Sequence, residues 1–123
     1  MQRPNVLILY TDQQRWDTVA AAGFPWMRTP NLDRLEREGA LLANAFCNSP
    51  VCMHSRQSML SGRYPSAVGC VCNGVDMPPD IPTLASLLKP YGYHTANIGK
   101  LHFRSHSNRD HREPHPSYGF DTL

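Results

Sequence analysis

The chain has 123 residues, 41% of them hydrophobic, and its 12 Lys and Arg against 10 Asp and Glu give a net charge of +2. This hydrophobic fraction excludes disorder as the default, and so small a charge gives no argument for binding nucleic acid or a membrane surface. No apolar run is long enough to span a membrane, and the run at residues 6–10 is too short for a signal peptide, so we expect a cytoplasmic protein. The four cysteines are then expected to be reduced.

The order of the predicted elements is typical of an α/β fold. Apolar runs predict strands at residues 4–10, 40–46 and 93–98. Apolar residues at helical spacing predict helices at residues 15–23 (weakly), 29–39, 56–61 and 82–89. This alternation predicts a mostly parallel sheet flanked by helices, with right-handed crossovers.

Turn residues predict where helices end and where loops lie. In the clearest helix, residues 29–39, Thr29 is the cap, Pro30 takes the first helical position and Gly39 takes the left-handed stop. Pro90 should forbid continuation of the helix at 82–89. Glycines and prolines predict an irregular loop over residues 66–80. Prolines also make a solvated loop the expected state of residues 103–118, rather than a metal site built from His106, His111 and His115.

One cysteine lies in a sequence that favours reactivity. Ser55 reads as the N-cap of the helix at 56–61 and Gly62 as its stop, which places Cys52 just before the helix start. There, free backbone N–H groups and the helix dipole favour a thiolate and a bound oxyanion. The alternative for a single cysteine is a small buried hydrophobic residue.

Polar side chains follow the predicted strands. Asp12 and Gln13 come directly after the first strand, and Lys100 and His102 come after the last. Because open α/β sheets bind ligands at the carboxyl edge of their strands, we expect these residues to converge with Cys52 and its helix. Ordinary turn chemistry is the alternative for Asp12 and Gln13.

The stretch around Cys52 resembles the signature of the sulfatase family, within the alkaline phosphatase superfamily. The matching positions are Cys52, Ser55, Arg56, Ser58, Leu60, Gly62, Tyr64 and Pro65. The resemblance implies that Cys52 is oxidised to formylglycine by a formylglycine-generating or sulfatase-maturing enzyme, and that the hydrated aldehyde is the nucleophile. His54 stands where the family has Pro or Ala, so an unoxidised thiolate that binds metal or phosphate is an alternative.

The first strand and its polar end resemble the sulfatase segment in which two adjacent acidic residues hold a divalent cation. By this resemblance Asp12 and Gln13 are metal ligands, with Cys52 at the same centre, and Ca²⁺ is expected, with Mn²⁺ or another cation as the alternative. Gln13 replaces the usual second acidic residue. The Asp-Gln pair is similar to that of phosphonate monoester hydrolases, which adds phosphate and phosphonate esters to the expected substrates.

Residues 99–102 resemble the family's Gly-Lys-Trp-His element, with Leu101 in the Trp position. The resemblance implies that Lys100 contacts the ester oxyanion, that His102 assists proton transfer and that Arg56 holds the hydrated aldehyde. Positions 100 and 102 point to one side if the backbone is extended there. Asn73 could also reach a substrate, although a turn-forming role is the commoner one for such a residue.

The resemblance covers nearly the whole chain but only the N-terminal portion of a sulfatase-type catalytic domain. We therefore expect residues 1–123 to form part of an alkaline-phosphatase-like sandwich, and to belong to a metal-dependent hydrolase of small sulfate, phosphate or phosphonate esters. The alternative is a truncated, non-catalytic fragment. An incomplete sheet would expose an edge, which leaves an oligomer or a complementing partner open.

Overall fold

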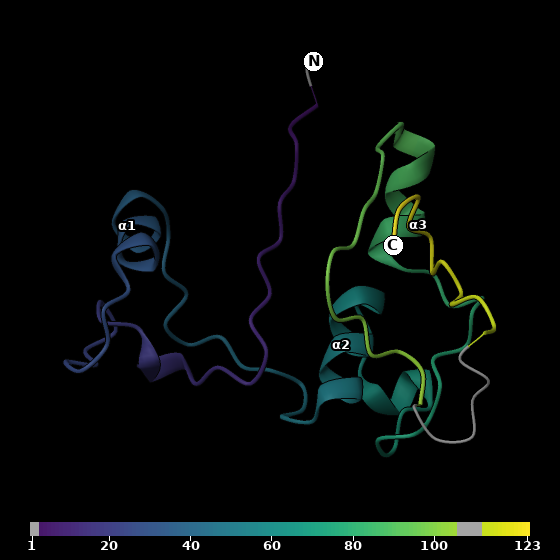
Figure 1. The fold of residues 1–123 in the computed structure, drawn as a ribbon, viewed down its shortest axis with the longest axis horizontal. Helices are drawn as coiled ribbons and strands as arrows, with labels where there is room; N and C mark the ends of the chain where they lie inside the picture. Colours follow the sequence, from purple (N-terminus) through teal and green to yellow (C-terminus); the bar gives the residue numbers. More distant parts are fainter. Residues whose placement is uncertain (1–2, 106–111) are drawn as a thin grey trace. The chain divides into compact units, whose positions relative to one another are not determined.

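The computed structural model describes residues 3–105 and 112–123 and divides into two compact units, Met1–Ala45 and Phe46–Leu123 (Figure 1). The α-helices are α1 (Pro30–Glu38), α2 (Cys52–Ser61) and α3 (Leu84–Leu88). Short 3₁₀ helices lie at Trp16–Thr18, Pro65–Val68 and Lys89–Tyr91. Over the described ranges, no helix has the length and apolar character needed to cross a membrane.

In the first unit, α1 begins at Pro30 as predicted, but Thr29 makes different contacts from those expected. Its hydroxyl accepts the N–H of Ala20 at 2.8 Å and donates to the Asp33 carboxylate at 2.8 Å, so it ties the preceding turn to the helix. The weak helix predicted at residues 15–23 is reduced to the 3₁₀ turn Trp16–Thr18 followed by turns. Gly39 has φ −121°, so its predicted left-handed stop was wrong.

The predicted sheet is not formed by the described residues, whose only β pairing is a single parallel bridge between Ala96 and Thr122. Residues 6–10 have no regular secondary structure and expose their apolar side chains, Leu7 by 82%. Residues 40–46 contain a turn, in which the Ala45 N–H donates to the Leu42 carbonyl at 3.3 Å. A strand needs a neighbour to complete its hydrogen bonds, and that pairing is absent here.

The second unit has a core made of two small clusters around α2. Leu60, Met77, Phe103 and Tyr118 form one cluster. Met53, Val68 and Cys70 form the other, and Ile81 packs against both. The Phe103 and Tyr118 rings meet edge to face with centroids 5.2 Å apart.

This core corrects the prediction of a solvated tail. Phe103 and Tyr118 are only 2% and 4% exposed, and the Tyr118 hydroxyl donates to the Met77 carbonyl at 2.9 Å. Burial of two aromatic rings favours ordering of the segments that carry them. His106 and His111 lie outside the described residues, so the expectation for them is not tested.

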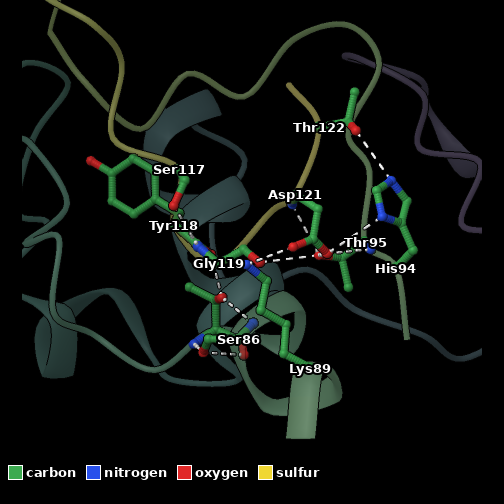
Figure 2. A network of polar contacts seen from close by, with 10 residues as sticks. Ser86, Lys89, His94, Thr95, Ser117, Tyr118, Gly119, Asp121 and Thr122 are labelled. Atoms are coloured by element: carbon green, nitrogen blue, oxygen red, sulfur yellow. Dashed lines mark hydrogen bonds and ion pairs between the residues drawn. The ribbon is translucent and has the colours of Figure 1, made fainter. Parts of the chain in front are cut away.

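The chain after α3 is held by polar contacts that Figure 2 shows. Thr83 caps α3 in a capping box with Ser86, and its hydroxyl also donates to the Tyr118 carbonyl at 2.6 Å. The Asp121 carboxylate accepts the Thr95 N–H at 2.8 Å and pairs with the Lys89 ammonium at 2.8 Å. These contacts anchor the C-terminal residues to the segment that leads into residues 99–102.

The α-helix stops before Pro90, but the chain continues as a 3₁₀ turn that includes Pro90. The α-helix ends at Leu88, and Pro90 lies inside the 3₁₀ turn Lys89–Tyr91 that continues from it. Proline is compatible with the first positions of a helical turn because its missing N–H has no partner to lose there. Gly92, with φ 76°, then ends the turn.

Candidate active site

Helix α2 begins at Cys52 itself, one turn earlier than predicted. Ser55 is therefore not the N-cap but lies inside the helix, where its N–H donates to the Val51 carbonyl at 2.9 Å. The preceding turn explains the early start, because the Ser49 hydroxyl accepts the Val51 N–H at 3.2 Å. The C-terminal prediction is confirmed: Gly62 adopts the left-handed conformation at φ 67° and donates to the Ser58 carbonyl.

Arg56 connects this helix to the segment that contains Lys100 and His102. The Arg56 residue is only 6% exposed, and its Nη1 donates to the backbone carbonyl of Lys100. A buried guanidinium that holds a backbone carbonyl is not a solvated surface arginine. The structure therefore brings the helix of Cys52 and the Lys100 segment together in one unit.

Asn73 contacts the first turn of α2. Its Oδ1 accepts the N–H of Met53, the residue after Cys52, at 3.4 Å. The Gly74 N–H reaches the Met53 sulfur at 3.1 Å, and the Gln57 Nε2 donates to the Val75 carbonyl at 3.0 Å. Residues 73–75 therefore pack along the helix that carries Cys52.

Residues 99–102 border a cleft of about 480 Å³. Gly99 has φ 106° and His102 has φ 56°, so the backbone is not extended through His102 and the predicted alternation of 100 and 102 does not hold there. A non-glycine residue with positive φ costs energy and is found preferentially at functional sites. Lys100 and His102 both line the cleft, with Leu101 between them.

His115 also lines this cleft, and sequence reasoning had placed it in a solvated loop. It is partly buried, its Nδ1 lies 2.9 Å from the Pro116 carbonyl, and its ring meets Tyr118 edge to face at 5.6 Å. Arg104 lines the same cleft but is paired with Asp76 at 3.2 Å. In the sequence, this burial was signalled by the aromatic residues at the two ends of the segment at residues 103–118, Phe103 and Tyr118.

Asp12 and Gln13 belong to the first unit, and both offer oxygen ligands of the kind a hard divalent cation prefers. Gln13 has φ 55°, so a second predicted site residue adopts the left-handed conformation. Within the described residues, no three His, Cys, Asp or Glu side chains gather in a metal-binding group, so two donors fit a cation without completing its shell. The convergence of this pair with Cys52 stays a prediction, because the residues lie in separate units.

No disulfide joins the four cysteines, Cys47, Cys52, Cys70 and Cys72. Cys52 is half-buried at the start of α2. Cys70 is 1% exposed, and this burial is the main cause that raises the pKa of its thiol. Cys70 therefore fits the role of a small buried hydrophobic residue, which was the alternative for Cys52.

Comparison with known proteins gives one consistent family. The family model "Sulfatase" matches residues 4–123. The ulvan-active sulfatase of Formosa agariphila is 35% identical over 97% of this chain and 23% of its own length. The choline-sulfatase of Rhizobium meliloti is 34% identical over 82% of this chain and 20% of its own length. Human N-acetylgalactosamine-6-sulfatase is 33% identical over 98% of this chain and 25% of its own length.

Solved structures agree with the sequence relatives. The structure described as "Crystal structure of Ps i-CgsB" matches with a TM-score of 0.85 and 31% identity over 98% of this chain and 27% of that chain. BT1596, described as a 2-O GAG sulfatase, matches with a TM-score of 0.74 and 25% identity over 91% of this chain and 23% of that chain. The chain thus spans about a quarter of the length of these relatives. With a family match that covers residues 4–123, the chain belongs to the sulfatase family.

Proposed function

We propose that this chain supplies the nucleophile and its cationic partners to a metal-dependent hydrolase of sulfate esters. The observation that carries the proposal is the contact between the buried Arg56 guanidinium and the Lys100 carbonyl. It joins the helix that starts at Cys52 to the segment that carries Lys100 and His102. A nucleophile, two cationic side chains and a proton carrier on joined segments of one unit match what transfer of an anionic group requires.

Cys52 is the proposed nucleophile precursor. Oxidised to formylglycine by the maturing enzyme, it supplies a hydrated aldehyde. One hydroxyl would attack the ester sulfur and displace the alcohol, and deprotonation of the second would re-form the aldehyde and expel the sulfate. The protein's contribution is to present this residue at the first position of α2, where orphan N–H groups and the dipole favour negative charge. An unoxidised thiolate stays the alternative proposal, because His54 stands where the family has Pro or Ala.

The remaining residues position and neutralise the ester. Arg56 fixes the Lys100 segment and shares the charge of the transferred group through a guanidinium that stays ionised. The Lys100 ammonium neutralises oxyanion charge, and His102 moves a proton at the nucleophile's hydroxyl. We propose that the side-chain NH₂ of Asn73 donates to an ester oxygen, because its side-chain Oδ1 already accepts the N–H of Met53 beside Cys52.

Asp12 and Gln13 are the proposed ligands of a divalent cation, Ca²⁺ first and Mn²⁺ as the alternative. Carboxylate and amide oxygens suit hard cations, which take six or more oxygen ligands, so water and other groups would complete the shell. Cys52, once modified, is the third proposed ligand. When bound, the cation supplies Lewis-acid stabilisation of the ester's charge.

The substrate class proposed is a sulfate ester, in line with names of relatives such as steryl-sulfatase and choline-sulfatase. The Asp12-Gln13 pair keeps phosphate and phosphonate esters as the second class, because one carboxylate fewer changes the charge that balances the ester. An aryl sulfate and an aryl phosphonate monoester with the same leaving group separate the two classes.

The test uses protein produced together with a sulfatase-maturing enzyme and assayed on 4-nitrophenyl sulfate with added calcium. We expect hydrolysis by the unaltered protein, loss of hydrolysis in Cys52→Ala, and an aldehyde in the peptide that spans residue 52 by mass spectrometry. The matched control is Cys47→Ala, which alters an exposed cysteine. Measurable hydrolysis by Cys52→Ala at the same rate as by the unaltered protein would show that the nucleophile is misassigned.

A further inference from the structure

The first turn of α2 lacks a cap of its own. The first backbone N–H groups of any helix have no partner within the helix, and a Ser, Thr, Asp or Asn at the N-cap normally accepts one of them. Here the N-cap residue is Val51, and no side chain at that position makes a cap hydrogen bond. The helix that presents Cys52 therefore depends on another part of the chain for this acceptor.

Asn73 supplies that acceptor from 20 residues away. Its Oδ1 lies 3.4 Å from the N–H of Met53, the second residue of the helix. Two further contacts hold the segment in place: the Gly74 N–H reaches the Met53 sulfur at 3.1 Å, and the Gln57 Nε2 donates to the Val75 carbonyl at 3.0 Å. Met53 is 1% exposed, so this attachment is to a buried residue of the core.

The backbone around Asn73 explains how an amide side chain reaches the helix. The Val75 N–H donates to the Cys72 carbonyl at 3.4 Å, which closes a turn with Asn73 and Gly74 at its centre. Gly74 has φ 110°, a conformation that residues with a β-carbon rarely adopt. The turn directs the side-chain Oδ1 of Asn73 to the helix, so the same turn conformation also makes the capping contact possible.

We infer that Asn73 is a positioning residue that caps α2 in place of Val51 and thereby fixes Cys52, a role that rests on the nucleophile function proposed above. The amide acts through the backbone N–H of Met53, one peptide unit from Cys52.

The test compares Asn73→Ala with Asn73→Asp in protein produced without a maturing enzyme, so that Cys52 remains a thiol. Alanine removes the acceptor, whereas aspartate keeps it and adds a negative charge. We expect the Met53 amide hydrogen to exchange about fivefold faster in Asn73→Ala, the size of losing one cap hydrogen bond, and at the original rate in Asn73→Asp. Asn44→Ala, which removes an exposed asparagine in the other unit, is the matched control.

The second readout is the rate of Cys52 alkylation at one fixed pH, assigned by peptide mass spectrometry, with the exposed Cys47 as internal reference. In Asn73→Ala the loosened first turn should expose the half-buried Cys52 and raise its rate relative to that of Cys47, whereas Asn44→Ala should leave this ratio unchanged. An unchanged Met53 exchange rate in Asn73→Ala, or an unchanged ratio of Cys52 to Cys47 alkylation in that variant, would overturn the role. Neither readout needs catalysis, so failure of the proposed hydrolysis is a separate result.

Discussion

Gly119 provides a sharp test of how the C-terminal segment packs on α3. A β-carbon at this position would lie 2.5 Å from the Ser86 nitrogen and 2.8 Å from the Ser86 Cα, closer than a real β-carbon approaches other atoms. Gly119 also has φ 90°, which an alanine adopts only at a cost. Gly119→Ala should therefore lower the free energy of unfolding of this unit by about 2 to 5 kcal/mol, from the conformational cost and the overpacking together.

The matched control is Gly69→Ala. Gly69 has a similar conformation, with φ 75°, but an added β-carbon there would meet no atom within 4 Å. It should cost only the conformational part, about 1 to 2 kcal/mol. The difference between the two variants isolates the contact with Ser86, whose N–H is held by the Thr83 cap at 3.1 Å.

Urea unfolding of the full chain, followed by the NMR signals of the buried Phe103 and Tyr118 rings, reports on this unit alone. We expect the midpoint to fall further in Gly119→Ala than in Gly69→Ala. If the two variants lost equal stability, residue 119 would not pack against the backbone of α3, and the polar network of Figure 2 would be arranged differently.

Two further predictions concern charged groups in the second unit. The pKa of the Asp121 carboxyl is lowered, chiefly by the hydrogen bond from the Lys89 ammonium and then by the Thr95 backbone N–H. This stabilisation is fully present above the unfolded pKa of about 4 and is lost as the pH falls through the folded value. Asp121→Asn should therefore lower the free energy of unfolding at neutral pH, and its stability should fall less on acidification than that of the unaltered protein. Urea titrations at neutral and at acidic pH would show both effects. Arg56→Lys should weaken the hold on the Lys100 carbonyl, because an ammonium lacks the reach and fork of a guanidinium. Amide exchange over residues 99–103 should then report a loss of about 1.5 to 3 kcal/mol in local stability, and exchange equal to that of the unaltered protein would show that this contact does not hold the segment.

Local signals in the sequence predicted several features correctly. Pro30 at the start of α1 and Gly62 at the end of α2 follow from backbone geometry that depends on a few neighbouring residues. The order of residues around Cys52 also indicated the sulfatase family, which the family model confirmed. Such features are readable because their causes lie within one or two turns of the chain.

Features that depend on distant partners were predicted poorly. Ser55 looked like an N-cap, but the Ser49 hydroxyl sets the turn and Asn73 supplies the acceptor, so α2 starts at Cys52. The apolar run at residues 4–10 was predicted to be a buried strand, yet no β pairing of it occurs within the described ranges. A strand is completed only by a neighbour, and apolar residues alone do not say which neighbour that is.

The sequence by itself determined which residues are candidates for the site and their order, Asp12, Gln13, Cys52, Arg56, Lys100 and His102, because a motif is a property of residue type and spacing. Only the tertiary structure decided that the Arg56 guanidinium holds the Lys100 carbonyl, that Asn73 reaches the helix of Cys52, and that the tail buries Phe103 and Tyr118. The Arg56 and Asn73 contacts join residues 44 and 20 positions apart, and they form because the packing of a shared core fixes which distant groups meet.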